Sequence, residues 1–178
     1  MARVKTGLFY GLLALSTLIL PPALKAGDEW RITASRKKCE VTDGKKVMGN
    51  TTMVPEGVLY EIKVTNGAFK DAPKTEARYM VFVERQKPAT RSSEDVVEKI
   101  KGKAAVPALR SRATEAFKTE PVTLWNGSLK GGFYYENGGR IRTKDRLVGI
   151  WVKLFEDGNE VGEYVNPTTL ASQHEWQE

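Results

Sequence analysis

The sequence predicts a mainly β fold, and three observations support this prediction. Apolar and polar residues alternate along most of the chain, which is the period of a half-buried strand. Short glycine-containing turn sequences separate these stretches, most clearly Asp157-Gly158 between two apolar runs. The composition, with 40% apolar and 28% charged residues in a chain of 178, is that of an ordinary globular domain.

The first 26 residues have the three parts of a signal peptide. Two basic residues, Arg3 and Lys5, precede a 14-residue apolar run at positions 7–20, and Ala26 offers a small residue for cleavage. This run is shorter than the ~20 residues that span a bilayer. We therefore expect residues 1–26 to be removed on export, and residues 27–178 to form one domain.

The charge of the mature part is weakly basic. The whole chain carries a formal charge of +6, and removal of residues 1–26, which contain three basic residues and no acid, leaves +3. Nucleic-acid binding normally requires a stronger and more clustered excess, so we expect no nucleic-acid partner. No second long apolar run follows, which predicts no stable membrane span after cleavage. Together with the export signal, this predicts a location in the periplasm, at the outer membrane or outside the cell.

The first strands are indicated by period-two patterns. Trp30, Ile32 and Ala34 share one face, and the apolar phase then changes, which predicts a bulge or break near residues 35–38. Residues 58–65 alternate cleanly after an expected turn at residues 55–57. Residues 79–83 are apolar on both faces, as in a central strand.

The middle of the chain has a helical pattern instead. A serine cap at Ser92 or Ser93 precedes Val96, Val97 and Ile100 on one helical face. Pro107 then begins a second stretch, in which Leu109, Ala113, Ala116 and Phe117 line one side. We expect a helical insertion around residues 92–118.

Strands return at residues 121–125, followed by expected turns at Asn126-Gly127 and at residues 137–139. Asp157-Gly158 then joins the two strands of a hairpin, because a type I′ turn needs two residues with positive φ. Pro167 should end the second of these strands, and an irregular tail follows.

The hairpin register suggests a candidate interaction surface. With Asp157-Gly158 as the loop, Ile150, Val152 and Leu154 form the core face. The opposite face carries Trp151 opposite Tyr164, with Phe155 and Lys153 beside them. These four residues are either a platform for a protein or a sugar, or a face covered by the helical insertion or the tail.

Few residues point to catalysis. His174 is the only histidine and Cys39 the only cysteine, so no disulfide forms within the chain and no His- or Cys-rich metal site exists. We expect Cys39 to be a half-buried strand residue. We expect no catalytic, cofactor-binding or metal-binding residues and no cofactor.

Short strands, glycine turns and a single domain together argue for an immunoglobulin-like β-sandwich with the helical insertion, and a partly open barrel is the main alternative. The segment RLVGIWVKLFEDGNEVGEYVNPTTL, after a signal peptide, resembles small secreted bacterial proteins with this fold, including those linked to type IV pilus gene clusters. The resemblance covers about the last quarter of the chain. It implies a non-enzymatic envelope or surface protein and identifies no functional residue.

Three functional hypotheses follow. The first is an exported, non-catalytic interaction or assembly domain whose partner is an envelope protein or a pilus-type assembly, bound through the aromatic face or an exposed edge strand. The second is a carbohydrate-binding module that uses the same aromatic face. The third, an enzyme of unrecognised type, has the least support from the residues.

Overall fold

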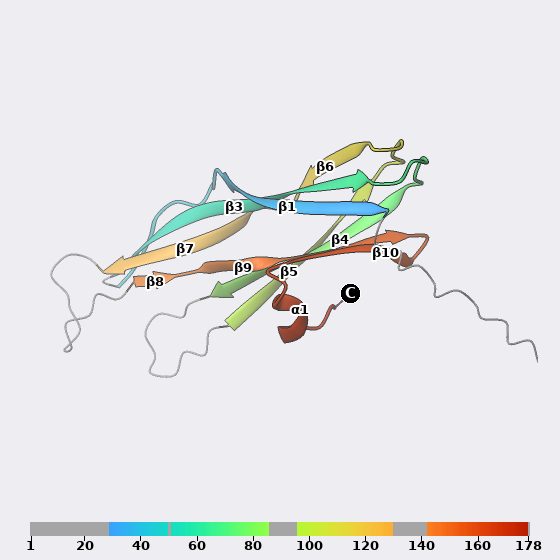
Figure 1. The fold of residues 1–178 in the computed structure, drawn as a ribbon. Coiled ribbons are helices and arrows are strands. Elements are labelled where there is room, and N and C mark those ends of the chain that lie inside the picture. The colour runs from blue at the N-terminus through green and yellow to red at the C-terminus, as the bar shows by residue number, and fades with distance from the viewer. Residues whose placement is uncertain (1–28, 50, 86–95, 130–141, 178) are drawn as a thin grey trace, which may run out of the picture.

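The structure is a sandwich of two antiparallel sheets (Figure 1). It is a computed structural model that describes residues 29–49, 51–85, 96–129 and 142–177, so the expected signal peptide at residues 1–26 lies outside the described residues. The six-stranded sheet has the order β1-β3-β7-β8, with β2 and β6 also paired to β3, and the four-stranded sheet has the order β10-β9-β4-β5. The elements, in chain order, are β1 (Trp30–Cys39), β2 (Lys46–Met48), β3 (Thr51–Asn66), β4 (Thr75–Arg85), β5 (Val96–Val106), β6 (Thr114–Lys118), β7 (Val122–Leu129), β8 (Arg142–Lys144), β9 (Arg146–Glu156), β10 (Asn159–Asn166) and α1 (Leu170–Gln173).

The predicted alternation places the core between the sheets. In β3, Val58, Tyr60, Ile62 and Val64 are all buried, and they face apolar residues of β4 and β9 in one cluster. Residues 79–83 of β4 are buried on both faces, which confirms the central strand. No helix in the described part of the chain has the length and apolar character that a membrane crossing requires.

The predicted hairpin is confirmed at its turn. Asp157 and Gly158 have φ angles of 47° and 84°, as a type I′ turn requires, and Glu156 pairs with Asn159. Ile150, Val152 and Leu154 are completely buried on the core face of β9. β10 ends at Asn166, directly before Pro167, as expected.

The prediction of a helical insertion is wrong. Residues 96–106 form β5, which pairs with β4 at eleven consecutive positions, and residues 114–118 form β6, which pairs with β3. Val97 packs on the outer face of the four-stranded sheet while Ile100 packs in the core, so two residues of the expected helical face point to opposite sides. Tertiary pairing of β-branched residues with β4 has overridden the helical spacing. The expected serine cap lies outside the described residues.

Three expected interruptions of strands are also wrong. β1 keeps one register with β3 from Trp30 to Cys39, because residues 35–38 extend past the core, where alternation is not needed. The expected turns at residues 55–57 and at Asn126-Gly127 lie inside β3 and β7, which pair with each other there. Cys39, half-buried at the end of β1, agrees with its prediction. The expected turn at residues 137–139 lies outside the described residues.

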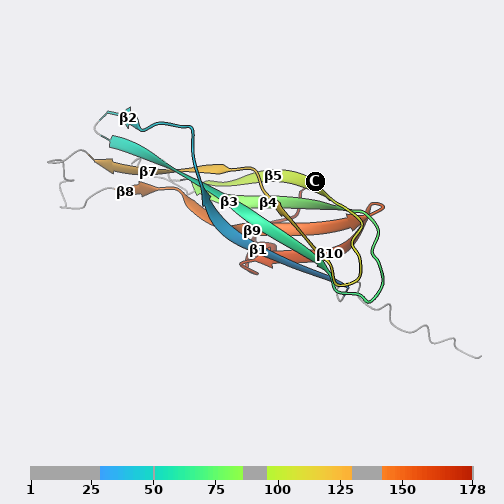
Figure 2. The same ribbon diagram turned by 90° about the horizontal axis from the view of Figure 1, so that it is seen from above.

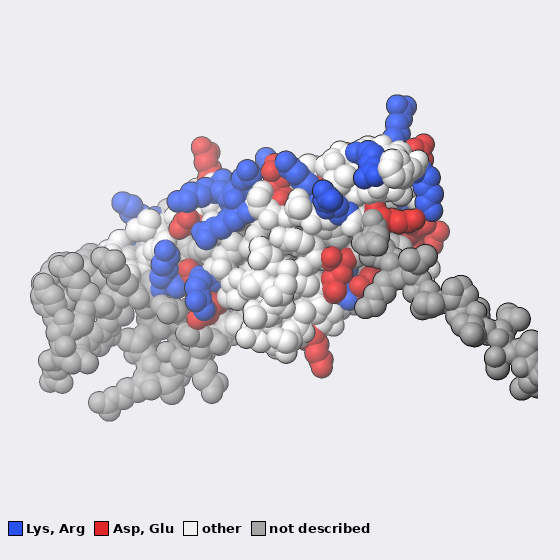
Figure 3. Space-filling view, in the orientation of Figure 1, with Lys and Arg blue, Asp and Glu red and all other residues white. Residues whose placement is uncertain are grey.

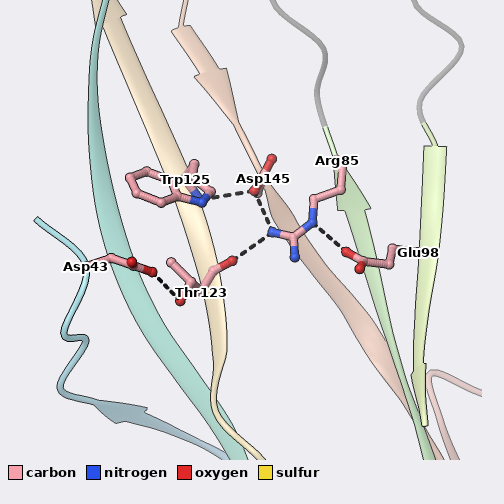
Figure 4. Close-up of polar contacts among 6 residues, drawn as sticks. All are labelled: Asp43, Arg85, Glu98, Thr123, Trp125 and Asp145. Atoms are coloured by element: carbon pink, nitrogen blue, oxygen red, sulfur yellow. Dashed lines mark hydrogen bonds and ion pairs between the residues drawn. The ribbon is translucent and has the colours of Figure 1, made fainter. Parts of the chain in front are cut away.

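The two sheets are tied together where the chain passes from β8 in one sheet to β9 in the other (Figure 4). Asp145 lies between these strands and is 6% exposed. Its Oδ2 accepts hydrogen bonds from Nη1 of Arg85 (2.7 Å) and from the backbone N–H of Trp125 (3.0 Å). Arg85 Nη1 also donates to the carbonyl oxygen of Thr123 (2.7 Å), and its Nε donates to Glu98 (2.7 Å). A side chain of β4 therefore binds the backbone of β7 across the sandwich.

The charge of Arg85 is stabilised by these partners. Burial lowers the pKa of the guanidinium, but the hydrogen bonds and charges of Asp145 and Glu98 outweigh burial, so the pKa lies above its ordinary value.

We expect Asp145→Ala to lower the free energy of unfolding by about 3 kcal/mol, because it leaves Arg85 and a backbone donor without their buried acceptor. Urea unfolding of the purified chain measures this change. Lys37→Gln, which removes an exposed ion pair to Glu61, serves as the control and should cost less than about 1 kcal/mol. Equal losses in the two variants would contradict the assigned role of Asp145.

We expect Gly158→Ala to destabilise the chain by about 1 kcal/mol, because an L-residue is strained at positive φ. Gly44→Ala is a matched control: a Cβ meets no atom within 4 Å at either glycine, but only Gly158 of the two has positive φ. Thermal unfolding should show a lower midpoint for the first variant alone.

Candidate functional site

The aromatic face predicted from the hairpin is divided between the two sides of the sheet. The predicted pairing holds as far as Glu160 opposite Phe155, and then the register shifts by one residue, so that Tyr164 pairs with Val152 and Val165 with Trp151. Tyr164 consequently packs against the core, while Trp151 lies on the outer face. The expectation that Trp151 stands opposite Tyr164 is wrong, because a bulge was not anticipated.

Gly162 is the sequence signal for this bulge, since glycine inside a strand often marks an extra residue or a close approach. A Cβ at Gly162 would lie 3.3 Å from the Cβ of Trp30, which shows how closely β10 approaches β1.

The C-terminal segment covers Trp151. Its indole ring is 5.5 Å from that of Trp176 in an edge-on arrangement, and only 6% of the residue is exposed. Nearby, His174 stacks on Phe82 at 4.9 Å, and Leu170 of α1 is fully buried. The structure thus agrees with the alternative in which the tail covers the outer face.

Lys153 and Phe155 lie on the same outer face as Trp151, but other side chains contact both. Lys153 binds Glu160 and Glu163 at 2.7 and 3.5 Å, and the Arg78 guanidinium lies 4.4 Å from the ring centre of Phe155. The four predicted residues therefore do not form one aromatic platform.

A second candidate surface lies at the end of the sandwich, where the connections β3–β4 and β5–β6 meet. We call residues 67–74 and 107–113 the loop tip; Figures 1 and 2 show the two loops side by side at the right-hand end. Asn66, 1% exposed, holds them together. Its Nδ2 donates to the carbonyl oxygens of Lys70 (2.8 Å), Arg110 (3.2 Å) and Leu109 (3.3 Å), while its Oδ1 accepts from the N–H of Ala68 (3.0 Å).

Further bonds fix the backbone of the loop tip. Ala72 and Leu109 exchange two backbone hydrogen bonds of 2.8 and 3.0 Å. Ser111 donates from its N–H to Asp71 and from its Oγ to the carbonyl of Ala68, both at 3.0 Å. A loop with so many internal bonds has little conformational entropy left to lose on binding.

The loop tip presents an aromatic side chain to solvent. Phe69 is 87% exposed, and the Arg112 guanidinium lies 4.2 Å from its ring centre. Arg112 has a φ of 61°, a left-handed conformation that is unfavourable for an arginine. Two hollows include residues of the loop tip. One, of about 410 Å³, is lined by Arg112 together with Arg31 and Glu163, and the other, of about 170 Å³, is lined by Asp71 together with Asn66.

Sequence reasoning missed Phe69 and Asn66. The available signal was an aromatic residue two positions after Asn66-Gly67, in a connection that should otherwise be polar. The role of Asn66 could not be foreseen, because its partners near residue 110 are more than 40 positions away in the chain.

Basic residues of the first strand lie among acids. Figure 3 shows lysine and arginine side chains along the upper layer, with acidic side chains between them. Arg36 and Lys38 both bind Glu56, at 3.5 and 3.4 Å. Burial raises the pKa of Glu56, but the hydrogen bond and charge of Lys38, with the charge of Arg36, outweigh it and hold the pKa below its ordinary value. Part of the positive charge of this layer is therefore used in ion pairs.

The described residues include no group of three or more His, Cys, Asp or Glu side chains that could hold a metal ion.

Comparisons with known proteins identify no family. No family model matches the chain, and its sequence has no significant match among curated proteins. Among solved structures, it is similar to β-glucuronidase 2 of Bacteroides uniformis (12% identity, TM-score 0.32, 78% of this chain and 12% of that one). It is also similar to a protein of Bordetella pertussis, with 13% identity and a TM-score of 0.32 over 72% of this chain and 95% of that one. A protein of Akkermansia muciniphila has 9% identity and a TM-score of 0.30 over 83% of this chain and 78% of that one. The chain thus spans about an eighth of the glucuronidase, and likenesses at this level carry no inference about function.

We expect Asn66→Ala to loosen the loop tip and to lower the free energy of unfolding by about 2 kcal/mol, since the carbonyl oxygens of Lys70, Leu109 and Arg110 each lose a hydrogen bond. Asn66→Asp keeps the acceptor for Ala68 but loses the donor, so it should be at least as harmful. Amide hydrogen exchange at Ala72, Leu109 and Ser111 should accelerate in both variants. Unchanged exchange there would show that Asn66 does not hold the loops together.

Proposed function

We propose that this chain is an exported, non-catalytic interaction domain of the cell envelope that binds a partner protein through the loop tip. The observation that carries the proposal is Phe69, an aromatic side chain that is 87% exposed on a loop fixed by the hydrogen bonds of the buried Asn66. Export is supported by the signal-peptide pattern of residues 1–26. An envelope protein or a pilus-type assembly fits this setting as the partner. We also propose that the sandwich is of the immunoglobulin-like type.

The exposure of Phe69 is unfavourable for the isolated chain and favourable for a complex. Burial of a phenylalanine side chain against a partner contributes about 1.5–3 kcal/mol. Aromatic and arginine residues carry much of the energy in protein interfaces, and Phe69 and Arg112 lie in contact at the loop tip. Strain at Arg112, whose φ is 61°, suits a surface under selection for binding rather than for stability alone.

The surroundings of Phe69 indicate the chemistry of the partner. Arg110 and Arg112 are exposed, and Lys70 pairs with Glu29 at 3.4 Å. Figure 3 shows basic and acidic side chains together at this end of the molecule. We infer that the partner offers an apolar pocket for Phe69 with acidic groups at its rim for the arginines.

The direct test places a photo-crosslinking phenylalanine analogue at position 69 of the full chain in the organism that makes it. The crosslinked protein is identified, purified and titrated against the unmodified chain. Crosslinks to no protein, or equally to many proteins, would contradict the proposal that the loop tip binds a specific partner.

We expect Phe69→Ser to weaken binding of that partner at least about tenfold, while the free energy of unfolding changes by less than about 0.5 kcal/mol because the side chain is exposed. Val47→Ser is a matched control: Val47 is 59% exposed on β2, at the opposite end of the sandwich (Figure 2). Phe155→Ser tests the face predicted from the sequence. Loss of binding in Phe155→Ser but not in Phe69→Ser would move the interface to the sheet.

A further inference from the structure

The outer face of the six-stranded sheet is a surface that neither the core nor the loop tip uses. In β3 the even-numbered residues from 58 to 64 are buried in the core, so the odd-numbered residues face outward. The pairing of β3 with β1 and β6 places Arg31, Lys37, Lys63 and Lys118 on this outer side. We call the outward residues of β1, of β6 and of β3 from 59 to 65 the basic face.

The basic face is open to solvent. Figure 1 shows β1, β3 and β6 in the upper layer of the sandwich, with the four-stranded sheet below them. In the described part of the chain no further strand or helix lies over this side, and Arg31, Lys63 and Lys118 are exposed.

Three of the four cations of the basic face have no acidic partner. Lys37 lies 3.8 Å from a carboxylate oxygen of Glu61, and Glu61 is the one acid among the outward residues of these strands. Within residues 29–49, 51–85, 96–129 and 142–177, the side chains of Arg31, Lys63 and Lys118 make no ion pair. The basic face therefore keeps an excess of unpaired positive charge, which favours an anionic partner.

The side chains between these cations are short. Thr33 and Ala116 lie on either side of Lys63, and Ser35 pairs with Glu61. None of the outward residues carries an aromatic ring on which a sugar could stack. Lysine is a point charge on a flexible stem, without the fork by which arginine binds a single phosphate at two points. The basic face thus suits a layer of negative charge better than a single small anion or a sugar chain.

We propose that the basic face binds the surface of an anionic lipid bilayer. Lys63, Lys118 and Arg31 lie against the lipid phosphates, and their flexible stems let the charges adjust to the positions of the headgroups. Each basic side chain at such a surface contributes about fivefold to the affinity. No residue of the loop tip belongs to the basic face, so the loop tip stays open to a partner protein, and failure of either proposal leaves the other in place.

The test is co-sedimentation of the purified exported chain with vesicles of phosphatidylcholine, and with vesicles of phosphatidylcholine mixed equally with phosphatidylglycerol. We expect binding to the mixed vesicles alone, and loss of this binding at about 1 M salt, where charges are screened beyond about 3 Å. Failure to bind the mixed vesicles, equal binding to both kinds of vesicle, or binding that salt leaves unchanged would overturn the proposal. Tighter binding to soluble polygalacturonate than to mixed vesicles, at equal concentrations of negative charge, would make a polysaccharide the ligand and would also overturn it.

Lys63→Gln/Lys118→Gln should weaken binding to the mixed vesicles about 30-fold and leave the fold intact, since both side chains are exposed. Lys63→Arg/Lys118→Arg keeps the charge and should bind as the unchanged chain does. Lys99→Gln/Lys103→Gln is the matched control, because it removes the same charge from the outer face of the other sheet. Phe69→Ser should leave vesicle binding unchanged. Equal weakening in the two glutamine variants would show a general charge effect and overturn the assigned surface.

Discussion

The carboxylate of Asp145 is the acceptor on which the joining of the two sheets depends. It lies where the chain leaves β8 and enters β9, and it binds one donor from each sheet, the guanidinium of Arg85 and the backbone N–H of Trp125. Apolar packing is not directional, so the core alone allows the sheets to slide over one another. The Asp145 bonds are directional, and they fix where β4 lies relative to β7. The placement of β5 and β9 relative to the six-stranded sheet follows, because both strands pair with β4.

Local patterns predicted those parts of the fold that local chemistry decides. The Asp157-Gly158 turn needs two positive φ angles, and the alternation in β3 needs only one buried face, so both could be inferred from a few neighbouring residues. The prediction of a helical insertion failed because the spacing of Val96, Val97 and Ile100 is compatible with a helix and with a strand equally well. Only the pairing with β4, which no short stretch encodes, decided between them. The bulge in β10 was not predicted for a related reason, since the close approach of Gly162 to Trp30 involves a strand at the other end of the chain.

The candidate surfaces were harder to predict than the fold. Three of the four residues expected to form one face do share it, but Trp151 is covered by Trp176, a residue of the tail that was expected to be irregular. The loop tip depends on Asn66 reaching carbonyl groups of a distant connection. This surface is a product of tertiary structure, whereas the sequence shows only that a phenylalanine is present at position 69 and not that it is exposed. β4 connects the loop tip to the joining of the sheets, because it begins at the loop tip and ends at Arg85.

The extra residue in β10 has a consequence for how such a chain could diversify. Because the shift between Glu160 and Gly162 decides which side of the sheet Tyr164 occupies, the number of residues in β10 determines which of its side chains face outward. A descendant that lost one residue there would exchange the inward and outward sets of the last strand in a single step, without any substitution. Its outer face would gain Tyr164 beside Lys153 and its core would lose it. Insertions and deletions, rather than point changes, are then the mutations through which this edge of the sandwich acquires new surfaces.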